Sequence, residues 1–414
     1  MPWRQISMAR RLLATEQGAS VRDWGGQLPI VLVYPNTYAV GMSSLAMHTL
    51  YRQWNALPGV VCERAFAALG RQAPADEPPI TLESQRPLAD AAVIAFSVSF
   101  ELDYFNVLDV LARAGVPLRA ADRQQGDPYV LLGGPAVSAN PMPLAPVADA
   151  VVIGEAEECL EALTGVLRES WAHDRAATLA ALRRLPGVYV PLLGEDERVS
   201  RLVAHDLDRW PTHTAIVAPQ AEFGDMYLIE ISRGCPHGCR FCLAGHLYRP
   251  MRERSLATLL AQARHGMQFR RKLGLVAAAV SDHTEIDALV AGLRQMGAAL
   301  SVSSLRMRPL SAPLVQALAE SGAQVITLAP EAGSERLRRA IHKGVTQDDI
   351  LAATALVAHQ GFETCKLYFM LGLPGETDDD IAELLALVRA IAAIFTRRIV
   401  VNLTPFVPKA HTPF

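Results

Sequence analysis

The 414-residue chain has little of what would place it outside the cell or in a membrane. It has six cysteines, too few for a disulfide scaffold, and no apolar signal core follows the arginine pair Arg10–Arg11. One of its longest apolar runs, residues 381–395, contains Glu383 and Arg389 and is too short to span a bilayer. These absences predict a cytoplasmic protein with reduced thiols and no membrane partner.

A strong charge of one sign is also lacking. The 39 lysines and arginines against 42 aspartates and glutamates leave a net charge of −3, so nucleic acid is not indicated as a partner. The hydrophobic fraction of 50% excludes a disordered chain and predicts two or three globular domains. No Gly-x-Gly-x-x-Gly follows the first predicted strand, which disfavours a dinucleotide site.

The first half of the chain alternates short apolar runs with amphipathic stretches. Continuous apolar strands separated by helices are typical of a parallel sheet covered on both faces, so we expect an α/β, doubly wound, Rossmann-like domain. Ligands of such sheets bind at the carboxyl ends of the strands. The predicted strands are 29–34, 60–62, 91–98, 129–132 and 150–153, and the predicted helices are 40–55, 102–114 and 155–169.

Glycines and hydroxyl side chains gather in the loops after these strands. Such loops let the backbone approach a ligand closely and supply hydrogen-bonding groups. One of them alone would be an ordinary tight turn, but four at one sheet edge predict a ligand site. The candidate binding residues are Tyr38, Gly41, Met42, Ser43, Ser97, Ser99, Gly133, Gly134, Pro135 and Glu155.

The second half also alternates strands and helices. Six β/α units are too few for a closed eight-fold barrel and predict an open, partial (β/α)6 TIM-like barrel, with its functional groups at the carboxyl ends of the strands. We therefore divide the chain into an N-terminal extension 1–28, a Rossmann-like domain 29–195, a linker 196–224 and a barrel 225–414. The expected strands are 226–232, 275–280, 299–304, 324–328, 364–371 and 398–404, and the helices are 256–271, 286–296, 313–320, 350–359 and 378–394.

Three of the six cysteines follow the first strand of the predicted barrel. Cys235, Cys239 and Cys242 have the spacing Cys-x3-Cys-x2-Cys, so one loop offers three thiolates to a soft metal centre. Structural zinc normally needs a fourth ligand, for which His237 and His246 are candidates. A 4Fe–4S cubane held by three thiolates instead leaves one iron open, as a catalytic centre requires.

This motif, with Phe241 before its last cysteine, resembles that of the radical S-adenosylmethionine (SAM) superfamily. The resemblance covers roughly residues 225–405. It implies an enzyme whose cysteines hold a 4Fe–4S cluster, with SAM bound at the open iron and an electron donor such as flavodoxin or ferredoxin as a partner. Reductive cleavage of SAM would give a 5′-deoxyadenosyl radical, which takes hydrogen from a substrate that the sequence does not identify.

Four later strand ends are similar to SAM-binding elements of that superfamily. The first lacks the usual Gly-Gly-Glu, and the second ends in an arginine that can pair with a carboxylate. The third resembles Glu-Ser-Gly-Ser with Ala332 in place of a serine, and the fourth resembles the Gly-x-Pro-Gly-Glu adenine contact. Alone, each would be an ordinary strand-end turn. The candidate residues are Ser281, Asp282, Ser304, Arg306, Glu331, Gly372, Pro374 and Gly375.

The N-terminal block resembles the cobalamin-binding domain that precedes many radical SAM cores, through Tyr38-x-x-Gly41-Met42 and residues 133–138 and 149–157. The resemblance implies that the loop residues named above bind cobalamin and that the protein is a cobalamin-dependent methyltransferase. The Asp-x-His-x-x-Gly motif, whose histidine ligates cobalt, is absent, and His48 is predicted to lie on a helix face. Cobalamin would then have no histidine ligand, or the domain would be vestigial.

Two other functions remain open. Residues 406–414 look similar to a segment of methylthiotransferases, so a radical SAM enzyme of another reaction type with a vestigial first domain is one alternative. Those enzymes carry three further cysteines, whereas only Cys62 and Cys159 lie in the first half. The other alternative is a non-catalytic zinc- or nucleotide-binding module. A partner chain at the C-terminus is also expected. The basic run Arg249–Arg254 could steer an anionic substrate or RNA.

Overall fold

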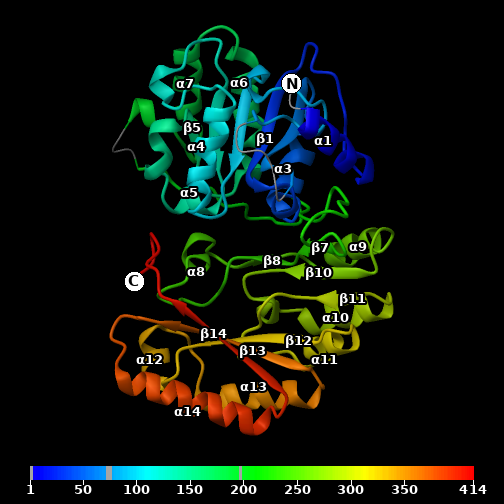
Figure 1. Cartoon of the computed structure of the whole chain (residues 1–414), viewed down its shortest axis with the longest axis vertical. Helices are drawn as coiled ribbons and strands as arrows, with labels where there is room; N and C mark the ends of the chain where they lie inside the picture. The colour runs from blue at the N-terminus through cyan, green and yellow to red at the C-terminus, as the bar shows by residue number, and fades with distance from the viewer. Residues whose placement is uncertain (1–2, 71–76, 195–197) are drawn as a thin grey trace. The chain divides into compact units, whose positions relative to one another are not determined.

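The computed structural model describes residues 3–70, 77–194 and 198–414. The chain divides into two compact units, Met1–Asp225 (unit 1) and Met226–Phe414 (unit 2), which are described separately below (Figure 1). Among the described residues, no helix combines the length and the apolar character that crossing a membrane requires.

Unit 1 is built on a six-stranded sheet in the order β2-β1-β3-β4-β5-β6, in which only β6 is antiparallel to its neighbour. The order 2-1-3-4-5 of the parallel strands is that of flavodoxin-like doubly wound sheets, which confirms the predicted class. The strands are β1 (Leu28–Thr37), β2 (Val60–Ala68), β3 (Val93–Ser97), β4 (Tyr129–Gly133), β5 (Ala150–Val152) and β6 (Val188–Tyr189). The helices are α1 (Trp3–Thr15), α2 (Tyr38–Gly41), α3 (Leu45–Ala56), α4 (Asp103–Arg113), α5 (Pro135–Ala139), α6 (Leu160–Ser170) and α7 (Arg175–Arg183).

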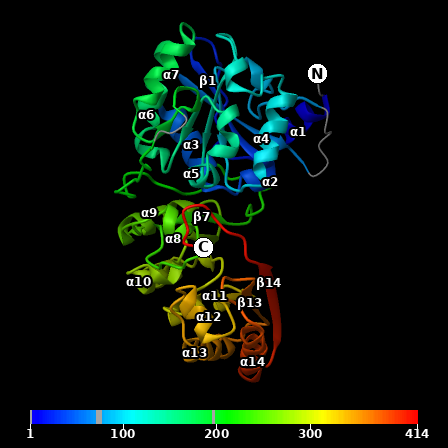
Figure 2. The same ribbon diagram turned by 90° about the vertical axis from the view of Figure 1, so that its left-hand side faces the viewer.

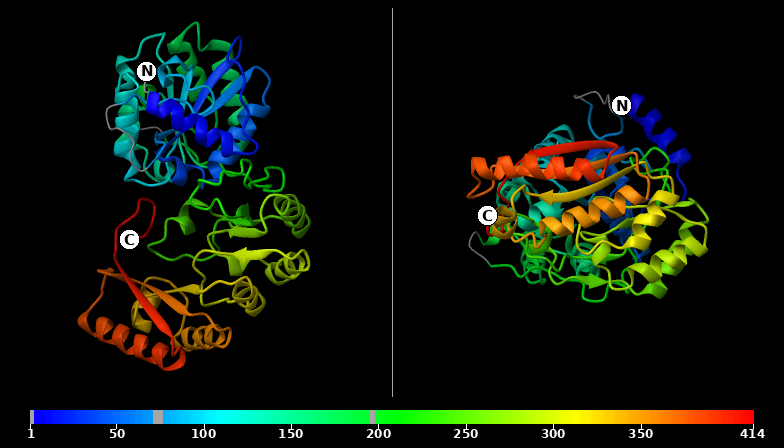
Figure 3. Two further views of the ribbon diagram at one scale, coloured as in Figure 1. Left: turned by 45° about the vertical axis from the view of Figure 1, so that its right-hand side comes forward. Right: turned by 90° about the horizontal axis from the view of Figure 1, so that it is seen from below.

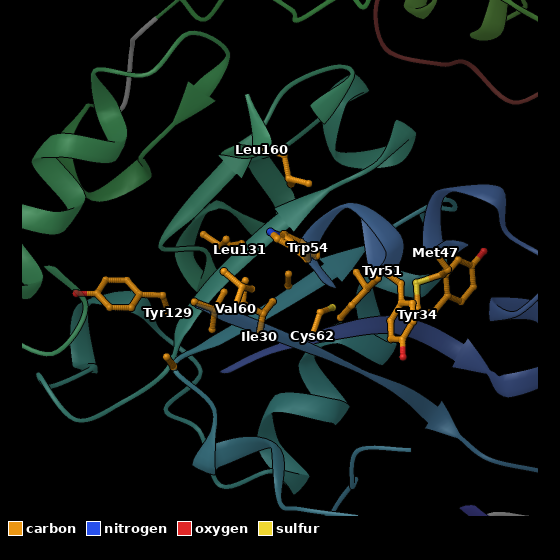
Figure 4. Close-up of a cluster of buried hydrophobic side chains, with 14 of the residues drawn as sticks. Ile30, Tyr34, Met47, Tyr51, Trp54, Val60, Cys62, Tyr129, Leu131 and Leu160 are labelled. Carbon is orange, nitrogen blue, oxygen red and sulfur yellow. The ribbon is translucent and has the colours of Figure 1, made fainter. Parts of the chain in front are cut away.

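The central strand β1 is apolar on both faces because helices cover both sides of the sheet. Ile30 and Leu32 point into a core shared with α1, α3, α6 and α7, whereas Val31 and Val33 point into a second core shared with α4 and α5. Figure 2 shows α6 and α7 on one side of the sheet and α4 on the other. Figure 4 shows the first core, where Trp54 of α3 lies over the strands.

Two segments that we expected outside the first domain belong to unit 1. The predicted extension 1–28 contains α1, whose apolar side is buried in the first core. The described part of the predicted linker 196–224 packs on the same core through Ile216 and Ala218, and Val217 pairs with Gln17. The expected boundary between 195 and 196 lies outside the described residues. Both segments look polar or irregular in sequence because most of their burial comes from distant elements.

Two predicted helices of unit 1 also start differently. The helix expected over 40–55 is divided into α2 and α3 by a turn at Met42–Ser44. The helix expected over 155–169 begins only at Leu160, after a short 3₁₀ turn. Both changes lie at the carboxyl edge of the sheet, where the chain must turn back over the strand ends.

Unit 2 has six main strands in two parallel three-stranded sheets, β11-β10-β7 and β12-β13-β14. This confirms the open partial barrel, with one difference: the sheet is interrupted between β11 and β12, which the single bridge Leu305–Leu328 connects. The strands are β7 (Tyr227–Glu230), β8 (Ser232–Arg233), β9 (Arg252–Glu253), β10 (Lys272–Val276), β11 (Ala299–Ser301), β12 (Val325–Glu331), β13 (Thr364–Leu371) and β14 (Arg398–Pro405). The helices are α8 (Ala244–Leu247), α9 (Leu256–Gly266), α10 (Ile286–Gln295), α11 (Ala312–Glu320), α12 (Glu335–Ala340), α13 (Gln347–His359) and α14 (Asp378–Ile394).

The main apolar core of unit 2 lies on one side of its strands. Leu273 of β10, Leu328 of β12 and Leu367 of β13 point into a core that is completed by α9, α10, α11, α13 and α14. Figure 3 shows these helices along the outer side of the strands. The opposite, inner side of the strands is therefore free to line a binding site.

Candidate functional site

The three motif cysteines lie on one loop between β8 and α8. Cys239 is buried, and Cys235 and Cys242 are half-buried. The loop starts at Gly234, whose φ of +91° is in the left-handed region and whose missing side chain leaves room for the carbonyl of Tyr248; a Cβ would stand 2.2 Å from that oxygen. Strand β9 returns antiparallel to β8 and closes the base of the loop.

The end of α12 holds the cysteine loop from a second side. Nδ1 of His342 donates to the carbonyl of Gly238 over 3.0 Å, and the amide of Arg240 donates to the carbonyl of Ile341 over 3.0 Å. The amide of Phe414 also donates to the Arg240 carbonyl over 3.2 Å. The loop is thus held by contacts with residues distant in sequence as well as by the turn at its own Gly234.

His237, inside the cysteine motif, contacts a residue predicted for SAM binding. Its Nε2 lies 2.6 Å from Oδ1 of Asp282, which ends a 3₁₀ turn after β10. The Asp282 side chain is only 7% exposed, and its Oδ2 has no hydrogen-bond partner among the described residues. The hydroxyls of Ser281 and Ser232 are buried and likewise unpartnered there. Several buried polar atoms near the cysteine loop therefore lack the partners that buried groups normally have.

The geometry does not favour a single metal ion at this loop. Among the described residues, no three His, Cys, Asp or Glu side chains converge tightly enough to hold one ion. The two histidines considered for zinc face elsewhere, His237 to Asp282 and His246 to the carbonyl of Cys239 at 3.2 Å. A cubane takes one thiolate at each of three corners, so the donor set fits a cluster better than tetrahedral zinc.

Two cations lie close enough to the cysteines to influence them. Burial raises the pKa of the Cys235 and Cys239 thiols, while the charge of Arg306 opposes that rise at both and Lys343 opposes it at Cys239. Arg306 is held by the carbonyls of Arg308 and Lys343, at 3.3 and 3.1 Å. The structure therefore brings the predicted residue Arg306 to the cysteines, where a positive field favours thiolates.

Lys343 is a residue that the sequence analysis missed. Its Nζ donates to Oε1 of the predicted residue Glu331 over 2.9 Å, and both side chains are largely buried. Glu331 has a φ of +70°, which is unusual for a residue with a side chain. No local pattern marks Lys343, because it follows the short helix α12 and acquires its position only when the chain folds.

Phe241 joins the cysteine loop to the other predicted elements. It packs on a small apolar cluster formed by Ala332, Leu337, Ile341 and Leu373. Ala332, which replaces the serine of the family pattern, thus has a packing role. The turn with Gly372, Pro374 and Gly375 carries Leu373 into this cluster, and its Gly375 carbonyl accepts from Arg336 of α12 over 2.8 Å.

Ser304 and the basic run after the motif have other surroundings than we expected. Ser304 is exposed and lines a cavity between β11 and β12. Arg254, in the run expected to steer a substrate, is buried and donates to Glu230, which also pairs with Arg233. That arginine stabilises the base of the loop.

In unit 1, much of the predicted loop after β1 turns into the protein interior. The Tyr38 hydroxyl donates to Glu16 over 2.6 Å, Met42 is buried, and a Cβ on Gly41 would stand 2.5 Å from the Phe66 ring. Ser43 donates to the carbonyl of Ala39. These residues are positioned as structural groups, because the turn between α2 and α3 folds them under the sheet edge.

Of the other residues predicted at this edge of the sheet, some are buried in structural contacts and others are partly exposed. Glu155 is buried and accepts from the amide of Ala204 over 2.9 Å, and Ser97 is buried at the end of β3. Gly134 has a φ of +106° and packs on Val98, where a Cβ would stand 2.5 Å from the carbonyl oxygen. Gly133 and Pro135 flank it, half-buried, at the start of α5.

A polar cluster that the sequence analysis missed lies where the strand order reverses, between β1 and β3. Oδ1 of Asp103 accepts from Asn36 over 2.9 Å and from Asn106 over 3.2 Å, while its buried Oδ2 has no partner among the described residues. Burial raises the pKa of Asp103, which the two amides oppose. Burial raises the pKa of the nearby Tyr34, and the predicted residue Ser99 opposes that rise. A carboxylate near the strand ends at a switch point is the signal by which this cluster could have been predicted.

Comparison with known protein families decides which chemistry these elements serve. Residues 46–191 match the family described as radical SAM proteins, N-terminal, and residues 229–388 match the radical SAM superfamily. An uncharacterised protein of Methanocaldococcus jannaschii is 32% identical over 391 residues, covering 93% of this chain and 78% of that protein. The chain belongs to the radical SAM superfamily. As a radical SAM enzyme, it uses a 4Fe–4S cluster and SAM and needs an electron donor.

Solved structures agree with the fold of this radical SAM enzyme. The methyltransferase TsrM of Kitasatospora setae, solved with cobalamin and a [4Fe-4S] cluster bound, has a TM-score of 0.62 at 15% identity, covering 94% of this chain and 77% of that one. OxsB, a cobalamin-dependent radical SAM enzyme, has a TM-score of 0.60 at 16% identity. Here 90% of this chain matches only 53% of OxsB, so OxsB is considerably longer. At these identities the likeness shows the fold.

Two further matches are to tRNA-2-methylthio-N(6)-dimethylallyladenosine synthases. The tRNA-2-methylthio-N(6)-dimethylallyladenosine synthase of Pelotomaculum thermopropionicum is 25% identical over 201 residues, covering 45% of this radical SAM chain and 44% of that enzyme. The synthase of Sorangium cellulosum is 28% identical over 190 residues. The chain thus matches less than half the length of these synthases.

Proposed function

We propose that this radical SAM enzyme is a cobalamin-dependent methyltransferase, with cobalamin at the carboxyl edge of the unit 1 sheet. The observation that carries the proposal is Asp103 at the switch point between β1 and β3, whose buried Oδ2 has no partner within the described part of the chain. Such a carboxylate oxygen can accept a hydrogen bond from a primary amide, and cobalamin carries primary amides around its corrin ring. The cobalamin-bound structure of TsrM, with the same fold, supports this reading.

The surroundings of Asp103 fit a large planar ligand with apolar and amide surfaces. Phe100, Leu102 and Phe105 are 60%, 81% and 74% exposed, beside the same strand end. Contiguous exposed apolar side chains on a folded domain mark a binding surface. When bound, cobalamin would supply a cobalt centre able to carry a methyl group, and the residues of this chain would orient its ring and limit access of water.

His48 is not available to ligate cobalt. It is 2% exposed, its Nε2 donates to the carbonyl of Met42 over 3.0 Å, and its Nδ1 accepts from the amides of Ala215 and Ile216 at 3.3 and 3.2 Å. Both ring nitrogens are therefore occupied by the backbone. We expect bound cobalamin to lack a ligand from this histidine.

The SAM site that we propose lies at the cysteine loop. Cys235, Cys239 and Cys242 would hold the cluster, which supplies one electron for cleavage of the sulfonium C–S bond. Asp282, whose Oδ2 has no partner in the described ranges and whose Oδ1 contacts His237, would accept a hydrogen bond from the amino group of SAM. The turn 372–375 beside Phe241 offers backbone to the adenine.

The test is anaerobic reconstitution with iron, sulfide and hydroxocobalamin, followed by desalting and a corrinoid absorption spectrum. We expect retained corrinoid in the parent protein and an affinity lower by about tenfold in Asp103→Asn, because a hydrogen bond to a charged acceptor is lost. Asp109→Asn is the matched control, since Asp109 lies on the same helix with a side chain 54% exposed. A parent protein that retains no corrinoid but still cleaves SAM would overturn the proposal.

The second candidate is a methylthiotransferase-like enzyme with a first domain that binds no cobalamin. The similarity to the two tRNA methylthio synthases favours it. Against it, the two cysteines of unit 1 are both buried, Cys62 in β2 and Cys159 before α6, and two thiols do not complete a second three-cysteine cluster. Corrinoid retention separates the candidates, because only the methyltransferase is expected to bind cobalamin.

A further inference from the structure

The inner side of β13 carries polar side chains that the cysteine site does not use. Side chains alternate along a strand, and Cys365, Leu367 and Phe369 are buried toward the helices. Lys366 and Tyr368 therefore project to the inner side, where both are half-buried. This side faces the interior of the open barrel.

Neighbouring strands extend this polar surface. The parallel register sets Thr327 of β12 opposite Lys366, and Asn402 of β14 opposite Tyr368. The side chains of Lys366, Tyr368 and Asn402 make no hydrogen bond or ion pair with any residue that the structure describes, in contrast to that of Lys343, which is paired with Glu331. Three adjacent polar groups thus have capacity for an external partner.

The charge on this surface has one sign. The register places no aspartate or glutamate on it, and two carboxylates that flank it in sequence are neutralised, Glu331 by Lys343 and Glu363 by Arg397. An ammonium without a carboxylate neighbour in a half-buried setting attracts an anion more strongly than one on an open surface. The inner-side residues of the three strands are Val325, Thr327, Thr364, Lys366, Tyr368, Met370, Arg398, Val400, Asn402 and Thr404.

A cavity continues from this surface into the interruption between β11 and β12. Its volume is about 370 Å³, within the range of small-molecule sites. Thr327 and Tyr368 of the inner surface form part of its wall, with Ser301, Ser303 and Ser304 after β11. Lys272 at the start of β10 also lines it. Its wall is therefore rich in hydroxyl groups, which suit a polar ligand.

We propose that this surface and cavity bind the substrate, and that the substrate is a small organic anion whose carboxylate or phosphate group lies on Lys366. Tyr368 and Asn402 donate to the oxygens of that group, and the serine-lined cavity receives the polar remainder. The substrate assignment rests on the proposed function, because it takes the barrel interior as the place where a substrate meets the adenosyl radical.

Lysine is scarce enough to make a direct test practical. The chain has four lysines, Lys272, Lys343, Lys366 and Lys409. Reductive ¹³C-dimethylation keeps the charge and one N–H of each, so the reconstituted, oxidised protein gives four lysine methyl signals besides the N-terminus. Titration with inorganic phosphate or with succinate should shift the Lys366 signal, and the arm that shifts it identifies the anionic group.

Calorimetric titration of the same anions measures the contribution of each residue. We expect Lys366→Met to weaken binding at least about tenfold and Tyr368→Phe about threefold, whereas Lys366→Arg retains most of it. Lys409→Met is the matched control, because Lys409 is equally half-buried. Circular dichroism confirms that each variant is folded, so a loss of binding cannot be a loss of structure.

The outcomes separate the substrate assignment from the proposed function. Equal shifts of Lys366 and Lys409, or no shift of Lys366 in either arm, would overturn the assignment even if SAM cleavage and corrinoid binding are intact. A selective Lys366 shift in a protein that retains no corrinoid would instead support an anionic substrate and contradict the methyltransferase.

Discussion

Two buried polar clusters, one in each unit, differ in whether their hydrogen bonds are complete. In unit 1, Arg64 is completely buried and is paired with two buried carboxylates, Glu16 at 2.6 Å and Glu83 at 2.7 Å. At the strand ends of unit 2, Ser232, Ser281 and Asp282 instead have buried polar atoms with no partner among the described residues. A satisfied buried group stabilises a fold, whereas an unsatisfied one costs free energy until a ligand supplies its partner. We call the satisfied groups the framework of the fold, and we take the unsatisfied ones as marks of a candidate binding site.

Asp103 shows that the comparison is not simply one unit against the other. It lies in unit 1, yet one of its oxygens is unpartnered, as in unit 2. Its place at the reversal of strand order is where a doubly wound sheet binds ligands. Unpartnered buried polar atoms therefore occur at both candidate sites, although others, such as those of Thr49, Gln53 and Gln262, lie on helices α3 and α9.

The largest expected effect comes from breaking the satisfied network. Arg64→Met should lower the free energy of unfolding of unit 1 by about 3–5 kcal/mol, because Glu16 and Glu83 are left as uncompensated buried carboxylates. Burial already raises the pKa of Glu83, and Arg64 opposes that rise. Urea unfolding measures the change. Arg339→Met, which removes an ion pair with a side chain 79% exposed, is the control and should change stability little. Equal effects would contradict the distinction.

His48 should make unit 1 sensitive to acid. Burial lowers its pKa from 6.5 to about 4. Below pH 6.5 the unfolded chain binds a proton on His48, whereas the folded chain binds it only near pH 4. The free energy of unfolding is therefore at its full value above pH 6.5 and falls by about 3 kcal/mol in total between pH 6.5 and pH 4. His48→Gln should flatten this part of the unfolding profile, whereas exposed His173→Gln should not. A parent profile without this fall would show that His48 is not held neutral.

A smaller effect is expected at Asp282, whose buried Oδ2 has no partner among the described residues. Asp282→Asn should weaken SAM binding by about tenfold through loss of charge, with iron content and stability nearly unchanged. Asp287→Asn on α10, which accepts only from Ser311, is the control. Equilibrium dialysis with the reconstituted protein gives the affinity. A fall in stability comparable to that of Arg64→Met would place Asp282 with the framework.

The sequence predicts the regular elements of unit 2 well. β13 and α14 have the same bounds in the structure as in the sequence analysis, Thr364–Leu371 and Asp378–Ile394. Their apolar periodicity is local, and the turn 372–375 separates them clearly. The interruption between β11 and β12 was not predicted, because pairing between strands depends on distant residues.

The functional residues were predicted less evenly. The cysteine loop and Arg306 lie together, as expected for groups at the carboxyl ends of the strands, but Tyr38 and Met42 lie in the interior of unit 1. A glycine- or tyrosine-containing loop has the same sequence whether it faces a ligand or the core. Lys343 and Asp103 were missed because their surroundings come from other elements, Glu331 for one and Asn36 for the other.

The single bridge between β11 and β12 has a mechanical consequence. The amide of Leu305 donates to the carbonyl of Thr327 over 2.9 Å, and a ladder such as the eight-residue pairing of β13 with β14 is absent there among the described residues. Spreading the two half-sheets would break one hydrogen bond worth about 1 kcal/mol, but it would also disrupt the apolar core that Leu300 and Leu328 share. The two half-sheets are thus held together mainly by the core that they share rather than by a continuous ladder of backbone hydrogen bonds.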